Sequence, residues 1–421
     1  MKRCVAILLA VAACDLNLAN PNAPPEDVVL NTVDGIVALA VGMQGQYAAS
    51  VGDFVVPPAL VTDEWGTTTR SLISYQSLLT GQGFDNSFAV VLAPWADAYR
   101  TIKSANDLLV HAPQVGLGSG LQAGILALAK LYKAMALGMI ILQYEQAPIT
   151  VGPTGGVPQP RSAVLDTILD LLESARTDFT TAVGLTEFNA RVLGSGFNVV
   201  NTIDAMRARY YLLAGQYQQA IDAADSVRAN VLSVFAYTAP ARNPIYDLWS
   251  SAATGYVAAL KSFRTSAEPG DRRVGYWVDT LATSFKGNPD SLLLPLKKFS
   301  TPTEAYPVYL PDEMKLIKAE AFTQLGVLDS AAFYVNAVRT QTSSPVDEPV
   351  AALPALDPAT QLDTPDKLVA QIAYERRYEL FEQGLRWEDT RRLGAGVTTT
   401  PTVPWLPIPR QECLADPSPG C

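Results

Sequence analysis

The sequence has little of the chemistry on which most enzyme sites depend. Its 421 residues include a single histidine, His111, and four cysteines, and it contains no CxxC or HExxH spacing. These absences exclude the usual zinc sites and most histidine-dependent acyl-transfer machinery. We therefore expect no catalytic residue, no metal and no cofactor, and we do not expect an enzyme.

Charge is also scarce. Only 17% of the residues are charged, and 41 acidic residues outnumber 31 basic ones to give a net charge of -10. An acidic chain offers phosphate no favourable field, so nucleic acid is excluded as a partner. The hydrophobic share of 48% is large enough to build a sizeable core and excludes disorder across the whole chain.

Long uninterrupted apolar runs are missing after the N-terminus. The best candidate, 121–142, contains Lys130 and Lys133, so we expect a buried helix there rather than a membrane span. The N-terminal run over 5–13 follows two basic residues and is too short to span a bilayer, which is typical of a signal peptide.

The end of this run carries a lipidation signal. The segment Val11-Ala12-Ala13-Cys14 resembles the bacterial lipobox, so we predict a signal peptide over 1–13 and a lipid on Cys14. An ordinary secretory signal with an incidental Cys14 is the alternative. Residues 14–28 are rich in Asn and Pro and suit an extended tether, so the protein would contact the membrane through its lipid anchor only.

Two further cysteines, Cys413 and Cys421, stand near the C-terminus. In an exported chain such a pair favours a disulfide that closes a small loop. Two free thiols are the alternative.

The body of the chain shows helical periodicity and a repeat. The spacing Ala208, Gly215, Ala220 recurs as Ala319, Gly326, Ala331, which is the tetratricopeptide pattern of a helical hairpin. We therefore predict an all-α fold of tetratricopeptide-like helical repeats. Apolar periodicity places helices at about 95–109, 121–143, 163–182, 203–213, 218–230, 313–325, 330–340 and 367–381.

A long segment at about 234–305 interrupts the repeats. It is rich in proline and aromatic residues and is predicted to be a loop-rich insertion. Loops on a rigid scaffold often carry binding residues. The alternative is that the aromatic rings only pack the insertion onto the helices. The rings are Tyr246, Trp249, Tyr256, Tyr276 and Trp277.

The block from Glu375 to Arg392 is densely charged but has no net charge, because five acids and five arginines alternate. This mixture favours a structural ion-pair network over the two isolated carboxylates of a glycosidase. Two pairs, Glu382 with Arg386 and Glu388 with Arg392, have the favourable spacing of four residues if they lie on helices.

The order of several motifs resembles the SusD/RagB family of bacterial nutrient-uptake lipoproteins. The strongest match is 375–389, which is similar to the family pattern ERR-x-EL-x-EG-x-RW-x-D. Two departures are Leu310, at a position where the family commonly has arginine, and Gln383, which interrupts the EG pair. The other matching segments are Thr62-Asp63-Glu64, 95–106, Ala319-Glu320-Ala321, 336–339 and 407–412.

The resemblance implies a SusD-like helical domain over 29–421 that contains the insertion. It implies a cell-surface lipoprotein of the outer membrane that binds glycans or other nutrients and acts as the lid of a SusC-like TonB-dependent transporter. Asp15, directly after Cys14, holds lipoproteins at the inner membrane in some bacteria, so the outer-membrane placement comes from the resemblance alone. A peptide-binding RagB-like lipoprotein and a tetratricopeptide-like envelope scaffold without a small ligand are the alternatives.

The ligand, an oligosaccharide or a peptide, is expected near the early loop and the insertion, where the family's ligand region lies. Sugar sites combine aromatic platforms with planar polar groups. The early loop supplies both within a short segment. The predicted binding residues are Asp63, Trp65, Arg70, Tyr75, Tyr246, Trp249 and Trp277.

Overall fold

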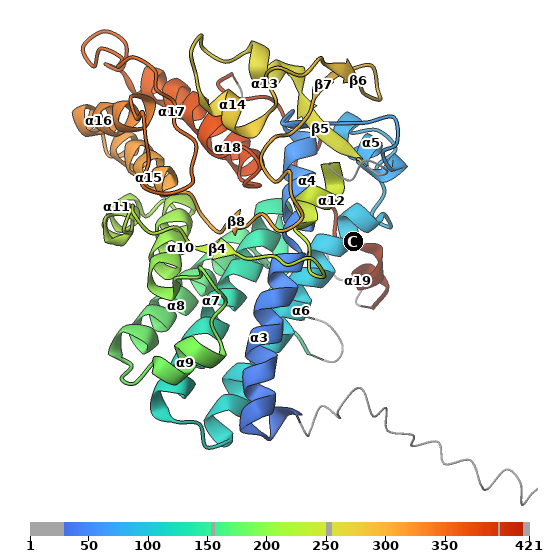
Figure 1. The fold of residues 1–421 in the computed structure, drawn as a ribbon, viewed down its shortest axis with the longest axis vertical. Helices are drawn as coiled ribbons and strands as arrows, with labels where there is room; N and C mark the ends of the chain where they lie inside the picture. The colour runs from blue at the N-terminus through green and yellow to red at the C-terminus, as the bar shows by residue number, and fades with distance from the viewer. Residues whose placement is uncertain (1–28, 153–155, 250–254, 395, 416–421) are drawn as a thin grey trace, which may run out of the picture.

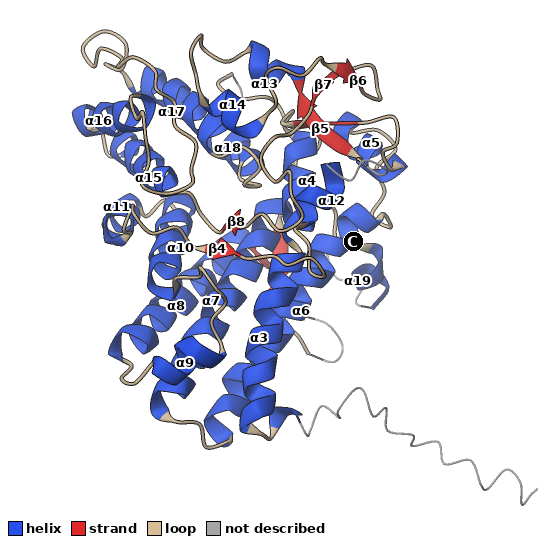
Figure 2. Cartoon of the chain, in the orientation of Figure 1, coloured by secondary structure: helices blue, strands red, loops and turns tan. Residues whose placement is uncertain are grey.

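The computed structural model describes residues 29–152, 156–249, 255–394 and 396–415. Helices dominate these residues, and the strands are two to four residues long (Figures 1 and 2), which confirms the predicted all-α class. The predicted signal peptide, the tether and Cys14 lie outside the described residues.

The longer helices are α3 (Val33–Ala49), α4 (Val51–Val61), α5 (Ile73–Thr80), α6 (Ala89–His111), α7 (Ser119–Gln143), α8 (Arg161–Thr181), α10 (Val199–Leu213), α11 (Tyr217–Ser226), α15 (Pro311–Gln324), α16 (Leu328–Arg339), α17 (Pro365–Glu379) and α18 (Arg386–Leu393). The shorter helices are η1 (Ala112–Gln114), α9 (Thr186–Arg191), α12 (Pro244–Trp249), α13 (Lys261–Thr265), α14 (Arg273–Trp277) and α19 (Arg410–Ala415).

Helix α7 lies at the centre of the long helices and packs against both α6 and α8. Among the described residues it is the one helix long and apolar enough to cross a membrane, but most of its surface is buried inside the protein. The close packing of α7 depends on small residues. A Cβ on Gly138 would lie only 1.7 Å from the hydroxyl of Tyr210 on α10, so α10 can approach α7 because this position has no side chain.

The predicted repeats are two helical hairpins, α10–α11 and α15–α16. Each hairpin turns at its glycine, Gly215 or Gly326, which adopts a left-handed conformation with φ of 72° and 75°. The four alanines of the pattern are fully buried where the paired helices meet. Helix α11 also packs against α15, so the two hairpins stack on each other, and α17 packs against both α15 and α16. The tetratricopeptide-like prediction is therefore confirmed.

Local signals start several of these helices. The side chains of Thr32, Asn198 and Thr364 accept hydrogen bonds from backbone N–H groups in the first turns of α3, α10 and α17. Pro311 and Pro365 occupy first-turn positions, where a missing N–H costs no helical hydrogen bond.

The ends of the predicted insertion are tied together. Strand β4 (Val234–Phe235) pairs with β8 (Tyr306–Pro307), so the chain leaves and re-enters the helical body at one place. Within the insertion, β5 (Val257–Leu260), β6 (Phe285–Lys286) and β7 (Leu292–Leu294) form an antiparallel sheet in the order β1-β5-β7-β6. The edge strand β1 (Trp65–Thr67) comes from the early loop. A separate pair is formed by β2 (Gln146–Pro148) and β3 (Pro158–Pro160).

The charged block 375–392 forms an ion-pair network, but not through the two predicted pairs. Helix α17 ends before Glu382, which has a positive φ of 63° in the turn that precedes α18. The four-residue spacing to Arg386 therefore does not lie on one helix. Arg392 pairs with Glu320 and with Asp389, and Glu388 pairs with Arg161 and Arg391.

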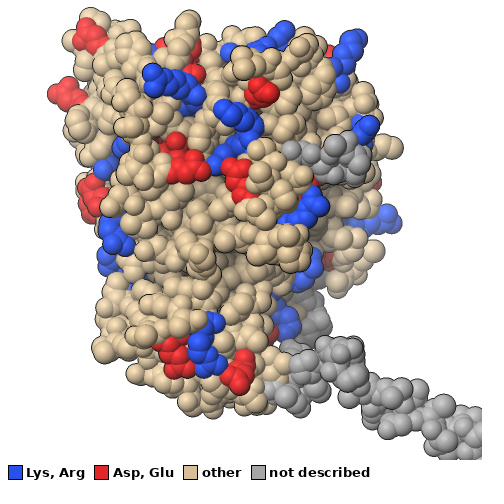
Figure 3. Space-filling model, viewed as in Figure 1, with Lys and Arg blue, Asp and Glu red and all other residues tan. Residues whose placement is uncertain are grey.

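Charged side chains are scattered in small groups over the face of the molecule in Figure 3, and wide areas between them carry none. This surface agrees with the low charged share of the sequence.

Candidate ligand-binding site

The four-stranded sheet joins the early loop to the insertion. Trp65 pairs with Ala259 and Thr67 with Val257, so the two segments run antiparallel. Just past the strand, the Thr68 N–H donates to the Tyr256 carbonyl at 3.0 Å, and the Thr68 hydroxyl donates to the Gly255 carbonyl at 2.6 Å. These hydrogen bonds hold the early loop and the insertion together beside a small cavity that both segments line.

The β6–β7 hairpin closes the cavity from the other side. The Asn288 N–H donates to the Thr67 carbonyl at 2.8 Å, which holds the hairpin against the end of β1. We call the resulting cavity of about 240 Å³ the sheet-edge pocket. Its lining residues are Thr68, Thr69, Arg70, Trp249, Gly255, Val257, Phe285 and Lys286.

Two of the predicted binding residues, Arg70 and Trp249, line the sheet-edge pocket together. Arg70 is exposed, whereas the Trp249 ring is half-buried and its indole N–H has no acceptor among the described residues. Phe285 adds a second aromatic ring that is 38% exposed. Lys286 adds a second cation, whose ammonium lies 3.3 Å from Asp290 at the surface.

The pocket therefore combines apolar rings, hydroxyls and cations. Aromatic faces bind the apolar faces of sugar rings, and guanidinium, ammonium and hydroxyl groups bind their oxygens. A volume of about 240 Å³ has room for an end group rather than for a whole chain of sugars. This arrangement can bind a polar ligand with apolar faces.

Tyr75 lies beside the pocket but does not line it. Its ring makes an edge-to-face contact with Tyr256 at a centroid distance of 6.3 Å. Burial is the main cause that raises the pKa of Tyr75 to about 12, with Asp53 adding to the rise, so the phenol keeps its proton at neutral pH. Tyr75 therefore packs against Tyr256, which lies in the chain between the lining residues Gly255 and Val257.

Two other predicted residues, Asp63 and Tyr246, are also outside the pocket. Asp63 is half-buried with a positive φ of 58°, and burial raises the pKa of its carboxyl although the charge of Arg377 opposes the rise. Tyr246 packs its ring against the guanidinium of Arg242 at 5.0 Å. Neither residue is among those that line the sheet-edge pocket with Arg70.

Trp65 and Trp277 were wrong predictions for ligand stacking. Both rings are 0% exposed, so neither offers a face to a ligand. Trp65 belongs to β1, all of whose residues are buried, and Trp277 donates from its indole N–H to the Tyr378 carbonyl at 2.9 Å. Both tryptophans stabilise the contact of the insertion with the helical body.

Sequence reasoning missed six of the eight lining residues, and four of them carry side-chain chemistry that a ligand could use, namely Thr68, Thr69, Phe285 and Lys286. The threonines sit between Trp65 and Arg70, inside the segment already chosen. Phe285 lies within the insertion and would have been found if phenylalanine had been counted with the other rings. No sequence pattern indicated Lys286.

Two larger cavities lie elsewhere. One of about 290 Å³ is lined by α3, by Tyr132, and by residues 190–195, Phe197 and 234–236. The other, of about 670 Å³, is lined by Arg264 and residues 267–272 and 274–276 of the insertion together with Thr280, Glu348 and Val350. We call it the insertion cavity. Neither contains a predicted ligand residue, whereas the sheet-edge pocket brings two of them together.

At the C-terminus, Cys413 is disulfide-bonded. Its predicted partner Cys421 lies outside the described residues, so the pairing stays a prediction.

No protein-family model matches the sequence, and no curated protein matches it either. Solved structures do match the fold over nearly its whole length. A SusD superfamily protein from Bacteroides vulgatus is 16% identical, with a TM-score of 0.70 over 92% of this chain and 98% of its own. B. fragilis NanU is 14% identical, with a TM-score of 0.70 over 95% and 98%. A laminarin-binding SusD-like protein is 18% identical, with a TM-score of 0.68 over 93% and 100%. The chain therefore has the fold of the SusD superfamily, as its sequence motifs predicted.

Proposed function

We propose that this chain is a SusD-like protein that binds an oligosaccharide in the sheet-edge pocket. The observation that carries the proposal is the meeting of Arg70 and Trp249, which are far apart in the sequence, at one cavity with a second ring and a second cation. The SusD-like fold supports it, since a laminarin-binding protein and a carbohydrate-binding protein from Bacteroides vulgatus share that fold.

The proposal includes a place in the cell. A lipid on Cys14 and the tether over 14–28 would hold the protein at the outer-membrane surface, where it would act as the lid of a SusC-like TonB-dependent transporter. The lipobox supports the anchor, and the family resemblance supports the partner. Binding and delivery, rather than turnover, are the proposed activity.

One feature of the pocket favours a second ligand class. Arg70 and Lys286 are two cations in its lining, and the ion pair of Lys286 among the described residues is with the exposed Asp290. Cations favour carboxylates, which occur in acidic sugars and at the C-termini of peptides. Binding that weakens with added salt would indicate such an anionic ligand, whereas a neutral sugar would bind independently of salt.

The test is isothermal titration calorimetry of the purified protein with a panel of neutral oligosaccharides, acidic oligosaccharides and peptides. For a ligand that binds, Trp249→Ala is expected to weaken the affinity at least tenfold, because the substitution removes the ring that forms one wall of the pocket. Phe285→Ala should also weaken binding. Tyr246→Ala is the matched control, since it removes a ring from the same helix α12 outside the pocket and should change the affinity less than twofold.

Equal losses for Tyr246→Ala and Trp249→Ala would place the ligand elsewhere. Failure of the whole panel to bind, together with recovery of several unrelated envelope proteins by the tagged protein, would favour the scaffold alternative. Chemical conversion of a panel member by the purified chain would contradict the proposed binding role.

A further inference from the structure

Three carboxylates meet inside the protein, away from the sheet-edge pocket. Asp312 comes from the first turn of α15, Glu348 from the segment that follows α16, and Glu379 from the last residue of α17. One oxygen from each lies within 4.8 Å of the other two. The three residues are 1%, 7% and 0% exposed, so water screens their mutual repulsion poorly. We call them the carboxylate cluster.

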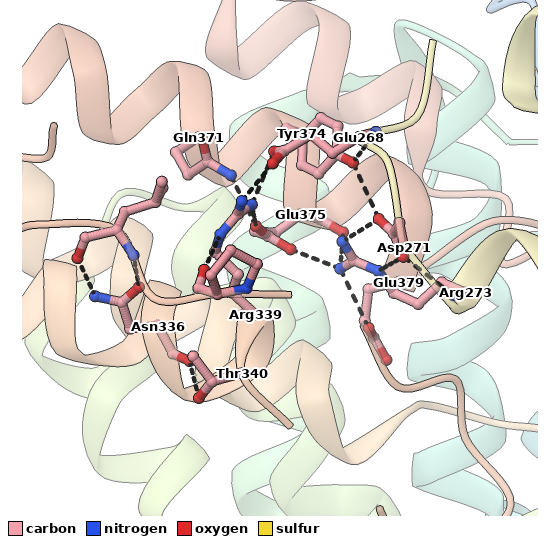
Figure 4. A network of polar contacts seen from close by, with 12 residues as sticks. Glu268, Asp271, Arg273, Asn336, Arg339, Thr340, Gln371, Tyr374, Glu375 and Glu379 are labelled. Atoms are coloured by element: carbon pink, nitrogen blue, oxygen red, sulfur yellow. Dashed lines mark hydrogen bonds and ion pairs between the residues drawn. The ribbon is translucent and has the colours of Figure 1, made fainter. Parts of the chain in front are cut away.

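Glu379 is the member of the cluster whose negative charge is balanced least by hydrogen bonds and nearby cations. Neither of its carboxylate oxygens accepts a hydrogen bond from the described residues. Its nearest cation is Arg273, at 3.6 Å, but this arginine makes shorter contacts of 2.8 Å with Asp271 and 2.6 Å with Glu375 (Figure 4). A buried carboxylate whose ion pair is this long is costly, so the cluster would be stabilised by a further positive charge, from a proton or from a cation.

Among the described residues, the cations around the cluster supply only part of that positive charge. Lys315 pairs with Asp312 at 2.5 Å, and Arg339 is engaged by Glu268 and Glu375 (Figure 4). The connected groups thus contain more acids than bases. The acids are Glu268, Asp271, Asp312, Glu348, Glu375 and Glu379, and the bases are Arg273, Lys315 and Arg339.

Glu348 is held in place for binding and is open to a cavity. Its Oε1 accepts a hydrogen bond from the Ser344 hydroxyl at 2.6 Å, and its Oε2 accepts one from the Asp312 N–H at 3.2 Å. Bonds of this kind orient ligating carboxylates. Glu348 also lines the insertion cavity of about 670 Å³, which gives an ion a route from solvent and gives water room to complete its coordination.

We propose that Asp312, Glu348 and Glu379 bind a divalent cation, with Ca²⁺ preferred. Carboxylate oxygens are hard ligands, and Ca²⁺ takes them at about 2.3–2.6 Å in flexible geometry. Oxygens on opposite sides of a Ca²⁺ ion are then about 4.6–5.2 Å apart, which accommodates separations up to the observed limit of 4.8 Å. Mg²⁺ binds at about 2.0–2.1 Å and demands a tighter octahedron. The ion would join α15, α17 and the segment after α16.

The test uses the full purified chain after chelator treatment and dialysis. Calorimetric titration with CaCl₂ is expected to give one binding event per chain, and MgCl₂ should bind more weakly. Saturating Ca²⁺ should raise the melting temperature by about 2–5 °C, because it binds only the folded state.

Glu379→Gln should abolish both the binding heat and the thermal shift. Glu382→Gln is the matched control, because Glu382 is also a wholly buried carboxylate whose oxygens lack hydrogen-bond partners among the described residues, but it lies outside the carboxylate cluster. The control should keep the Ca²⁺ response. If Glu379→Gln does not fold, Glu348→Gln at the edge of the insertion cavity replaces it.

Two results would overturn the proposal. In the first, neither Ca²⁺ nor Mg²⁺ produces heat or a thermal shift at millimolar concentration, which would mean that the carboxylates share protons instead. In the second, Glu379→Gln and Glu348→Gln respond to Ca²⁺ as the unmodified chain does, which would place the ion elsewhere. Both results leave the sheet-edge pocket unaffected, so failure here is separate from failure of the proposed function.

Discussion

Glu64, next to the buried Trp65, is a wholly buried acid whose ionisation opposes folding. Burial is the main cause that raises the pKa of Glu64 to about 8, although the charges of Arg386 and Arg377 oppose the rise. The side chain is 3% exposed, so it is protonated in the folded protein at neutral pH. In the unfolded chain it ionises near its ordinary value, so the folded state binds more protons between these two values.

This difference gives a signed prediction. The stabilising effect of the protonated Glu64 is complete below about pH 4.5 and is lost progressively as the pH rises towards about 8. Glu64→Gln removes the titration, so its free energy of unfolding should fall less steeply over that range, by up to about 1.4 kcal/mol per pH unit. Urea unfolding of both proteins at a series of pH values measures the two slopes.

An exposed glutamate gives the control. Glu145→Gln makes the same chemical change at a position that faces solvent, so it is the matched control for the substitution itself. Parallel slopes for the unmodified protein and Glu64→Gln would contradict the assignment of a raised pKa to this residue. Asp53 and Glu348, whose pKa values are also raised, to about 7, titrate in all three proteins and do not affect the comparison.

Single residues also show where sequence reasoning stops. Trp65 was predicted to bind ligand, and for Trp249 and Trp277 the sequence left binding and packing as alternatives. The outcome depends on the pairing of β1 with β5 and on the packing of α14 against α17, and both are long-range contacts. Only Trp249 turned out to line the pocket, with Arg70.

At the level of elements, the close packing of helices in the core depends on glycine, which has no side chain. Gly138→Ala would bring a Cβ within 2.2 Å of the Tyr210 ring carbon that carries the hydroxyl, and Tyr210 is buried and cannot turn away freely. We expect a loss of about 1–3 kcal/mol in the free energy of unfolding, as for other overpacked cores. Chemical denaturation measures it.

Gly42→Ala is the matched control on another helix. The new Cβ on α3 would meet nothing within 4 Å, so the substitution should stabilise the protein by up to about 1 kcal/mol through helix propensity. If both alanine variants shifted stability in the same direction by the same amount, the close contact between α7 and α10 would not be the cause.

Elements with local signals were predictable, and elements with distant partners were not. The Ala-Gly-Ala spacing identified both helical hairpins, because the turn glycine and the buried alanines act within one hairpin. The four-stranded sheet was missed, because β1 finds its partner β5 about 190 residues later and the strands are too short to show a period of two. The predicted pair of Glu388 with Arg392 was wrong for a similar reason, because Arg392 pairs with Glu320 on another helix.

For the whole molecule, order and spacing of motifs carried most of the information. The SusD-like fold followed from the motif order although the solved structures are only 14–18% identical. The carboxylate cluster was invisible in the sequence, because its members are separated by more than 30 residues and each belongs to a segment with its own local function. A predicted absence of metal sites rested on histidine and cysteine, whereas a hard cation uses neither.

The proposed anchor and partner lead to a prediction for the complete protein in its membrane. Cys14→Ala should move the protein from the membrane fraction to the soluble fraction, because the described structure offers no other apolar helix that is free to insert. The unmodified protein, extracted in mild detergent, should copurify with one TonB-dependent barrel. A lid that stays with its transporter requires an interface of about 2,000 Å² or more. The wide uncharged areas in Figure 3 are compatible with such an interface, since the cores of stable interfaces are depleted in charge.

The two halves of this prediction separate the rival roles. If Cys14→Ala releases the protein from the membrane but the unmodified protein copurifies with no barrel, the lipid anchor is supported and the proposed lid role is contradicted. A Cys14→Ala variant that stays in the membrane fraction after a high-salt wash would contradict the predicted lipid on Cys14. Mass spectrometry of the unmodified chain would then show no acyl group. A scaffold would recover several envelope proteins in unequal amounts, whereas a lid should recover one barrel in a fixed ratio. Ligand binding by the isolated chain together with that fixed ratio is the combination that only the lid explains, because a scaffold has no use for the sheet-edge pocket.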